Sequence, residues 1–161
     1  MPPSEAPTVE DFPAHGVNAI ASMAQRALGY LIDAVIVQLP FVLASVAALL
    51  AAPDPAEYVT PWWAVTVQAV VFITYQTVLL AWRGRTVGCA AVGIRIARYG
   101  NGGRPTLSQA AIRCLIPGIF GANSLTALIE PLIPLTALLD QSGLRRAWHD
   151  KAAGTVVVRT R

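Results

Sequence analysis

Charged residues are scarce in this sequence. Asp, Glu, Lys and Arg make up 13% of the 161 residues, whereas about a quarter of an average soluble domain is charged. Hydrophobic residues make up 55%, and this shortage of polar surface argues against an ordinary water-soluble fold. Because a membrane-spanning helix takes about 20 residues, the chain has room for three or four membrane segments and none for a separate catalytic domain.

Basic residues are almost absent from the first half of the chain. Eleven of the twelve Lys and Arg residues follow Trp82, and the twelfth is Arg26. Segments rich in Lys and Arg remain on the cytoplasmic side of a membrane, so this asymmetry predicts cytoplasmic ends. The pI is near 9.2, but the basic residues flank apolar segments. Orientation and anionic lipid headgroups account for them, and we expect no nucleic-acid partner.

Patterns that carry chemistry are also missing. Cys89 and Cys114 are isolated and lack the CxxC spacing of metal or redox sites, so we interpret them as packing thiols. The glycines between positions 84 and 93 lack the Gly-Lys-Ser/Thr ending of a phosphate-binding loop. His149 and Asp150 are adjacent, with no Ser or Cys nucleophile arranged around them. We therefore expect no enzyme activity, no metal site and no cofactor.

The first half of the chain divides into a tail and two apolar spans. Residues 1–16 contain four prolines and three acids but no basic residue, which predicts a disordered tail rather than a signal peptide. Residues 17–25 are mildly apolar, and we expect a short helix on the membrane surface. The first span is predicted over residues 27–52, followed by an acidic loop. The second has a tryptophan at each end, Trp62 and Trp82, about 30 Å apart along a helix.

The second half is polar and glycine-rich before it becomes apolar again. Residues 83–104 carry five arginines and six glycines and do not suit lipid. Residues 92–96 alternate in the manner of a strand, residues 155–159 have similar character, and we expect the two segments to pair at the cytoplasmic surface. The apolar stretch between them is broken by Pro and Gly and is too short for two full spans. It predicts a hairpin of short helices over residues 107–120 and 124–139.

The expected fold is therefore an all-α membrane protein. It consists of a small helical bundle with two full transmembrane helices, a short Pro- and Gly-broken helical hairpin and a minor cytoplasmic two-stranded element. The transmembrane domain is expected over residues 17–158, between the tail and a basic end at residues 159–161. Both termini are expected in the cytoplasm.

Asp33 is the first residue that could carry a function. It lies about two turns inside the first span, where an ionised carboxylate without a partner costs several kcal/mol. Arg26 lies seven residues earlier and therefore on nearly the same helix face, so we expect its long side chain to neutralise Asp33. The pair could orient and staple the helices, or it could take part in transport.

The predicted hairpin also contains opposite charges, Arg113 and Glu130. On adjacent short helices these two side chains could pair, and the Glu130-Pro131 step coincides with a predicted helix break. Polar residues within the two spans, such as Gln68 and Tyr75, could line a polar path or serve as hydrogen-bonding contacts between helices.

Three segments together resemble the RDD family of bacterial membrane proteins, which is named for one arginine and two aspartates. The first is Arg26-Ala-Leu-Gly-Tyr-Leu-Ile-Asp33. The second is Gly84-Arg-Thr-Val-Gly88 followed by Val92-Gly-Ile-Arg-Ile96. The third is Arg145-Arg-Ala-Trp-His-Asp150-Lys-Ala-Ala-Gly-Thr-Val-Val157. The resemblance extends from about Met23 to Val158, and the order and spacing of the three segments carry it.

The resemblance implies roles for individual residues and a bacterial inner-membrane location. Arg26 corresponds to the family arginine, Asp33 to the first aspartate and Asp150 to the second, with Asp140 as the alternative for that position. Cys89 departs from the family pattern, which usually has lysine there. The remaining residues that match the family signature are Gly84, Thr86, Gly88, Gly93, Arg95, His149, Lys151, Gly154 and Thr155.

Two functions are compatible with these features. The chain could be an accessory or scaffold subunit of an envelope or transport complex, docking other membrane proteins or further copies of itself through its apolar helices. It could instead be a small oligomeric transporter in which Asp33 binds a proton or cation and Arg26 is its charge partner. The resemblance supplies no general molecular function; ligand transport is a suggested role of the family, including cation/proton exchange in some members.

Overall fold

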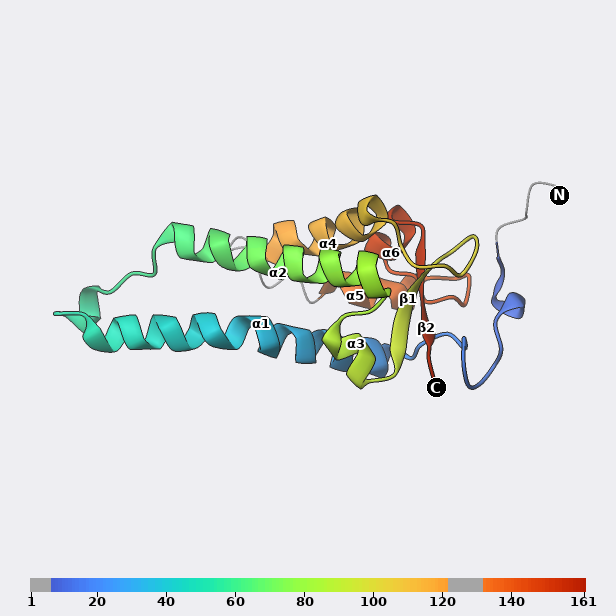
Figure 1. Ribbon diagram of the computed structural model, residues 1–161, viewed down its shortest axis with the longest axis horizontal. Coiled ribbons are helices and arrows are strands. Elements are labelled where there is room, and N and C mark those ends of the chain that lie inside the picture. Colours follow the sequence, from blue (N-terminus) through green and yellow to red (C-terminus); the bar gives the residue numbers. More distant parts are fainter. Residues whose placement is uncertain (1–6, 122–131) are drawn as a thin grey trace.

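Two long helices, α1 (Met23–Ala51) and α2 (Trp62–Arg83), run side by side as an elongated hairpin in the computed structural model (Figure 1). The structure describes residues 7–121 and 132–161. A short 3-10 turn, η2 (Pro55–Glu57), lies in the loop between the two helices. Helix α1 starts where Ser22 and Gln25 cap it reciprocally: the Gln25 N–H donates to Ser22 Oγ, and the Ser22 N–H donates to Gln25 Oε1.

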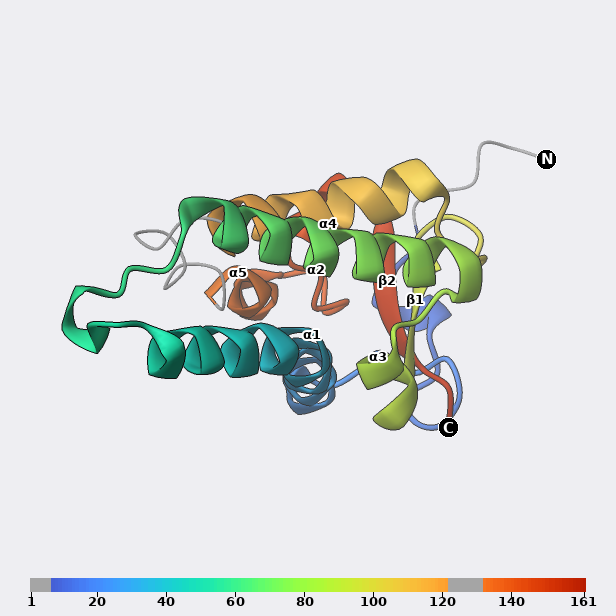
Figure 2. The same cartoon turned by 60° about the vertical axis from the view of Figure 1, so that its left-hand side comes forward.

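The other elements gather at the end of the hairpin where α1 begins and α2 ends. Figure 2 shows α4 running alongside α2, with the two strands crossing at this end. The elements are α3 (Val87–Ala91), β1 (Ile94–Arg98), α4 (Leu107–Gly121), α5 (Leu132–Leu135), η3 (Thr136–Leu139), α6 (Trp148–Ala152) and β2 (Thr155–Arg159).

Strands β1 and β2 form an antiparallel pair, which confirms the predicted pairing of these segments. Ile96 stands opposite Val157 in the register. Ile94, Ile96 and Val157 pack against α2 and α4. On the opposite face, Val156 and Val158 belong to a second cluster that includes Phe12 and Ile20 from the N-terminal segment. The sheet is thus covered on both faces, so its strands are more completely buried than the alternation in residues 92–96 indicated.

We expected a helix over residues 17–25, but only Met23–Gln25 are helical, as the start of α1; residues 17–18 form a turn, and residues 19–22 run along β2. The Ala21 N–H donates to the Val157 carbonyl at 3.0 Å, and the Arg159 N–H donates to the Ala19 carbonyl at 2.8 Å. Ile20 forms an isolated bridge with Val158. The reason is that β2 has an open edge whose backbone groups need partners, and this segment supplies them.

The expected tail and hairpin fall partly outside the described residues. Residues 1–6 are not described, and residues 7–16 lie against the sheet end of the molecule: Phe12 packs on the second cluster, and the Tyr99 hydroxyl donates to the Pro7 carbonyl. A 3-10 turn, η1 (Val9–Asp11), lies in this segment. For the predicted hairpin, α4 matches its first helix, residues 122–131 are not described, and the rest of its second helix is α5 followed by η3.

Both long helices have the length and composition of membrane spans. Over their most apolar windows, mean hydropathy is 2.4 in α1 and 1.7 in α2, and only 6% and 11% of those windows is buried within the protein. At about 1.5 Å per residue, even the shorter helix exceeds the ~30 Å hydrocarbon thickness. The described chain is thus mostly helical, with two long apolar helices and a small two-stranded sheet.

Candidate functional site

Asp33 is buried on α1 and accepts three hydrogen bonds, one from α2 and two from the start of α3. Its side chain lies where α1 faces α2 and α3, and the residue is 3% exposed. The Tyr75 hydroxyl donates to Oδ1 at 2.8 Å, and the Gly88 N–H donates to the same oxygen at 2.8 Å. The Thr86 hydroxyl donates to Oδ2. These donors satisfy the carboxylate without a cation.

The segment that holds Asp33 owes its shape to Thr86 and to small residues. Thr86 is the N-cap of α3, and its hydroxyl oxygen accepts from the Cys89 N–H at 3.2 Å while it donates to Asp33. A Cβ atom on Gly88 would overlap the carbonyl oxygen of Gly29 and lie 2.9 Å from the Asp33 carboxylate. Glycine at this position therefore lets α3 approach α1 closely enough for the backbone to bind Asp33.

Arg26 does not pair with Asp33, and that expectation was wrong. Its Nη1 lies 3.4 Å from Asp150 Oδ2 and donates to the Arg145 carbonyl. Its other nitrogens donate to the carbonyls of Ala21, Leu144 and Val157. The reason is geometric: side chains on a helix lean toward its N-terminus, so Arg26 reaches away from Asp33 and toward the loops around β2 and α6.

Asp150 is the partner of two arginines. It lies on the first turn of α6, its side chain is 1% exposed, and it also accepts from the Ala147 N–H at 3.1 Å. Arg26 approaches one oxygen and Arg113 of α4 forms an ion pair with the other. Arg113 also donates to the Thr155 hydroxyl at 3.3 Å. One buried carboxylate thus joins α1, α4 and α6. The aspartate that binds Arg26 is Asp150 and not Asp140.

The predicted partner of Arg113, Glu130, lies outside the described residues. Asp140 forms a separate group: Lys151 Nζ lies 3.0 Å from Oδ1, and the Arg146 N–H donates to Oδ2 at 2.7 Å. Burial alone would raise the pKa of Asp140, but hydrogen bonds from Arg146, Lys151 and Ser142 outweigh it and lower the pKa to about 2. Asp140 is therefore ionised at neutral pH.

His149 stands beside the two-arginine group. It is 7% exposed, and its Nε2 lies 3.8 Å from Asp150 Oδ1. Burial lowers the pKa of His149 well below 6.5, and the positive charges of Arg113 and Arg26 lower it further. The imidazole is therefore neutral at pH 7, and the adjacent Asp150 is engaged by arginines rather than by this histidine.

A cavity of about 70 Å³ lies beside Asp33. Polar side chains on its wall include Arg26, Asp33 and Arg113, while Leu80, Ile94 and Ile96 supply apolar surface. A space of this size has room for a few water molecules.

Within residues 7–121 and 132–161, no group of three or more His, Cys, Asp or Glu side chains is arranged to hold a metal ion.

The remaining residues of the signature shape the turns around the site. Gly84, Gly93 and Gly154 have φ values of +68°, +72° and +61°, which favour glycine, and they stand at the end of α2, before β1 and before β2. Arg95 donates to the Gly102 carbonyl at 2.9 Å, outside the site. Thr155 is fully buried and lies against Asp150.

Two important residues were not singled out from the sequence for these roles. Tyr75 was identified only as one of several polar residues in the second span, and its bond to Asp33 depends on the packing of α1 with α2. Gly29 provides the carbonyl surface against Gly88. Its position one helical turn before Asp33 was the available signal, because residues at this spacing share a helix face.

Comparison with known proteins links these residues to a family. The model of the RDD family matches residues 20–154, a range that includes Arg26, Asp33, the Thr86 segment and Asp150. No curated protein and no solved structure matches the chain.

Proposed function

The chain belongs to the RDD family, and on this premise we propose that it is a small integral membrane protein acting as an accessory or scaffold subunit of a larger membrane complex. One observation carries the proposal. The long helices leave most of their apolar surface exposed, while the buried charges of the described chain are bound within the chain itself.

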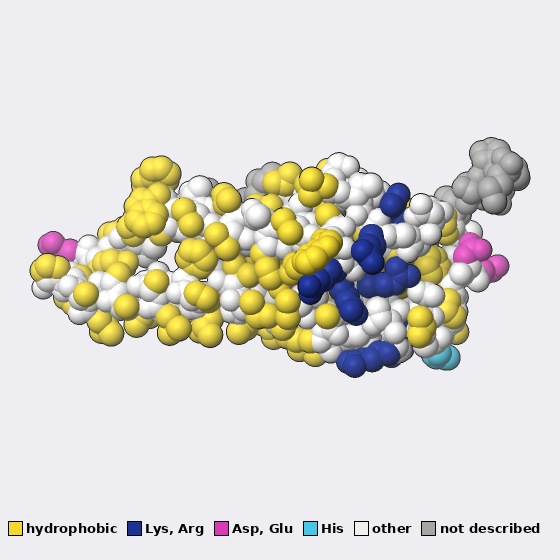
Figure 3. Space-filling model, in the orientation of Figure 1, with side chains coloured by type: hydrophobic (Ala, Val, Ile, Leu, Met, Phe, Trp, Pro, Cys, Tyr) yellow, Lys and Arg dark blue, Asp and Glu magenta, His cyan; other side chains and the backbone are white. Residues whose placement is uncertain are grey.

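The distribution of charge supports a membrane-crossing hairpin. Figure 3 shows Lys and Arg side chains gathered at the sheet end of the molecule, apolar side chains covering the hairpin, and acidic side chains both near its tip and at the sheet end. The loop at that tip contains Asp54 and Glu57 and no basic residue. By the bias of Lys and Arg toward the cytoplasm, we propose that the chain crosses the inner membrane of a bacterial cell twice, with both termini inside.

The binding of the aspartates favours a scaffold role over a catalytic one. Asp33 is fully occupied by Tyr75, Thr86 and Gly88, and Asp150 by two arginines. These contacts link α1 with α2, α3, α4 and α6 at the sheet end. In contrast, the outer part of α1 exposes large apolar side chains such as Leu43 and Leu50, which are 60% and 78% exposed. In a membrane this face is free to contact lipid or another protein.

Photo-crosslinking tests this function. A photoreactive amino acid placed at Leu43 or Leu50 in the full chain, in native membranes, should capture one membrane protein reproducibly and in stoichiometric yield. The matched control carries the same group at Asn101, in the exposed turn after β1, and should not capture that protein. Capture of only lipid or of a second copy of the chain would contradict the accessory role.

Transport is the second candidate, and the cavity beside Asp33 is the observation that favours it. The cavity places water-sized space next to a carboxylate between the two long helices and α4. Two spans make a thin pathway, so a transporter would require several copies of the chain. Proteoliposomes under an imposed proton or cation gradient test this function: flux no greater than in empty liposomes would exclude it. Unchanged flux in Asp33→Asn would exclude Asp33 as the ion-binding group.

A further inference from the structure

Three exposed arginines stand where the apolar hairpin meets the polar end of the molecule. Arg83 ends α2, Arg85 follows it, and Arg104 lies just before α4. Figure 3 shows a group of basic side chains at this boundary, against a large apolar side chain. In the described part of α1 after Arg26, and in α2 before Arg83, there is no Lys or Arg.

These three arginines have no carboxylate partner in the described part of the chain. Among residues 7–121 and 132–161, no carboxylate oxygen lies within 4.0 Å of their guanidinium groups. Arg104 Nη1 donates to the Trp82 carbonyl at 2.9 Å, and the Arg83 guanidinium lies 4.6 Å from the centre of the Trp82 ring. Carbonyl and ring contacts hold the side chains in place but leave their charge available to an anion.

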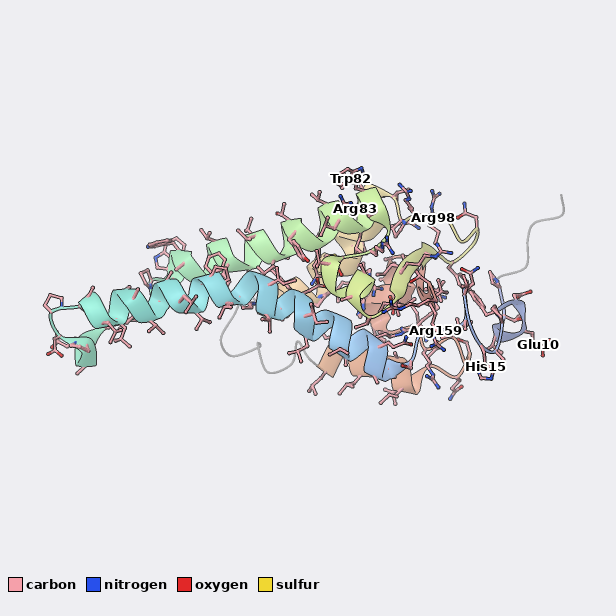
Figure 4. All side chains as sticks on the ribbon, turned by 60° about the horizontal axis from the view of Figure 1, so that its bottom comes forward. Glu10, His15, Trp82, Arg83, Arg98 and Arg159 are labelled. Carbon is pink, nitrogen blue, oxygen red and sulfur yellow. The ribbon has the colours of Figure 1, made fainter. Side chains whose placement is uncertain are left out.

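Apolar side chains are interleaved with these charges. Trp82, Val87 and Leu107 are 63%, 48% and 63% exposed, and each lies within three residues of one of the arginines. Figure 4 shows Trp82 and Arg83 projecting outward together from the end of α2. Such a mixture of exposed apolar and cationic side chains is typical of the headgroup region of a bilayer, where tryptophan is enriched. It is less favourable on a surface that faces only water.

We propose that Arg83, Arg85 and Arg104, together with Trp82, form a binding surface for the phosphate groups of anionic phospholipids. This inference rests on the proposed membrane insertion and adds a lipid preference to it. Anionic headgroups complement the unpaired guanidinium groups, while the tryptophan ring and the adjacent apolar side chains contact the upper acyl chains. RNA has the same phosphate chemistry, but the exposed apolar residues between the arginines would then face water.

Spin-labelled lipids measure this preference in the intact chain. The protein is reconstituted in phosphatidylcholine bilayers, and the motionally restricted fraction is compared for spin-labelled phosphatidylglycerol and spin-labelled phosphatidylcholine. In the wild type, the motionally restricted fraction should be several-fold larger for spin-labelled phosphatidylglycerol than for spin-labelled phosphatidylcholine. Because salt screens exposed charges, 1 M NaCl should reduce this difference. Equal retention of both lipids would overturn the proposal.

Two variants test whether the named residues are responsible. Arg83→Gln/Arg85→Gln/Arg104→Gln should lose the preference. Ala14→Glu/Asn101→Asp/Gln141→Glu lowers the net charge by the same three units at exposed positions and should keep it. If the arginine variant kept the full preference, or if a labelled RNA oligomer displaced phosphatidylglycerol from the wild type, the assignment would be wrong.

Resistance to alkaline carbonate extraction measures membrane insertion separately from lipid preference. Failure to insert contradicts the proposed function, whereas insertion without lipid preference contradicts only this inference.

Discussion

Arg26 and Asp33 lie seven residues apart on α1, yet their side chains bind opposite parts of the surrounding structure. Arg26 reaches Asp150 in α6, whereas Asp33 receives hydrogen bonds from Thr86 and Gly88 at the start of α3. The two charged residues of α1 therefore belong to two separate groups of contacts and do not pair with each other. The stability of each variant is the free energy of unfolding of the full chain in detergent.

The first prediction concerns energetic coupling. Asp150→Asn should destabilise the protein by about 3 kcal/mol, because it leaves the buried Arg26 and Arg113 side chains without their carboxylate partner. Arg26→Gln should cost less, because Arg113 still pairs with Asp150. In a double-mutant cycle, Arg26 and Asp150 should couple by at least ~1 kcal/mol, whereas Arg26 and Asp33 should couple by less than ~0.5 kcal/mol. A strong coupling free energy between Arg26 and Asp33 would contradict the separation of their contacts.

The second prediction concerns the charge on Asp33. Asp33→Asn retains an oxygen acceptor but removes the charge that strengthens three hydrogen bonds, so it should lower stability by about 1–3 kcal/mol. Asp33→Ala should cost more. The control is Asp54→Asn in the exposed loop between the long helices, which should change stability by less than ~0.5 kcal/mol. A neutral effect of Asp33→Asn would show that the charge contributes nothing to folding.

The third prediction tests the close approach of α1 and α3. Gly88→Ala should destabilise the protein by about 1–3 kcal/mol or more, because the added methyl group would overlap the Gly29 carbonyl. Gly100→Ala is the matched control, because a Cβ there meets nothing within 4 Å. Similar stabilities for the two variants would mean that α3 is not held against α1 as described.

The fourth prediction concerns pH. The pKa of His149 is well below 6.5 in the folded chain, so below pH ~6.5 the unfolded chain binds a proton that the folded chain does not. Stability should therefore fall between pH 6.5 and 5, with a slope of up to ~1.4 kcal/mol per pH unit. His149→Gln should flatten this part of the profile, while His15→Gln, at an exposed site, should leave it unchanged. A slope that survives in His149→Gln would assign the pH dependence to other groups.

Local pattern was sufficient for the two long helices and the strand pair, but not for the short helices α3 and α6 or for the contacts of the site. The second span was expected to end at Trp82 and ends at Arg83, and the expected strands pair in the register that sets Ile96 opposite Val157. The segment before α1 was misinterpreted because a mildly apolar sequence is compatible both with a surface helix and with an extended segment that pairs with the edge of a strand. Only the exposed edge of β2 distinguishes the two structures.

The sequence by itself determined the two long apolar helices, the basic end and the residues that carry the signature of the family, because length, hydropathy and charge are properties of contiguous segments. It also indicated that Asp33 needs partners. Only the tertiary structure decided which partners these are, since Thr86 is 53 residues from Asp33 and Asp150 is 124 residues from Arg26 along the chain. A buried charge is stabilised by whichever donors the packing brings near it, and helical spacing alone does not specify them.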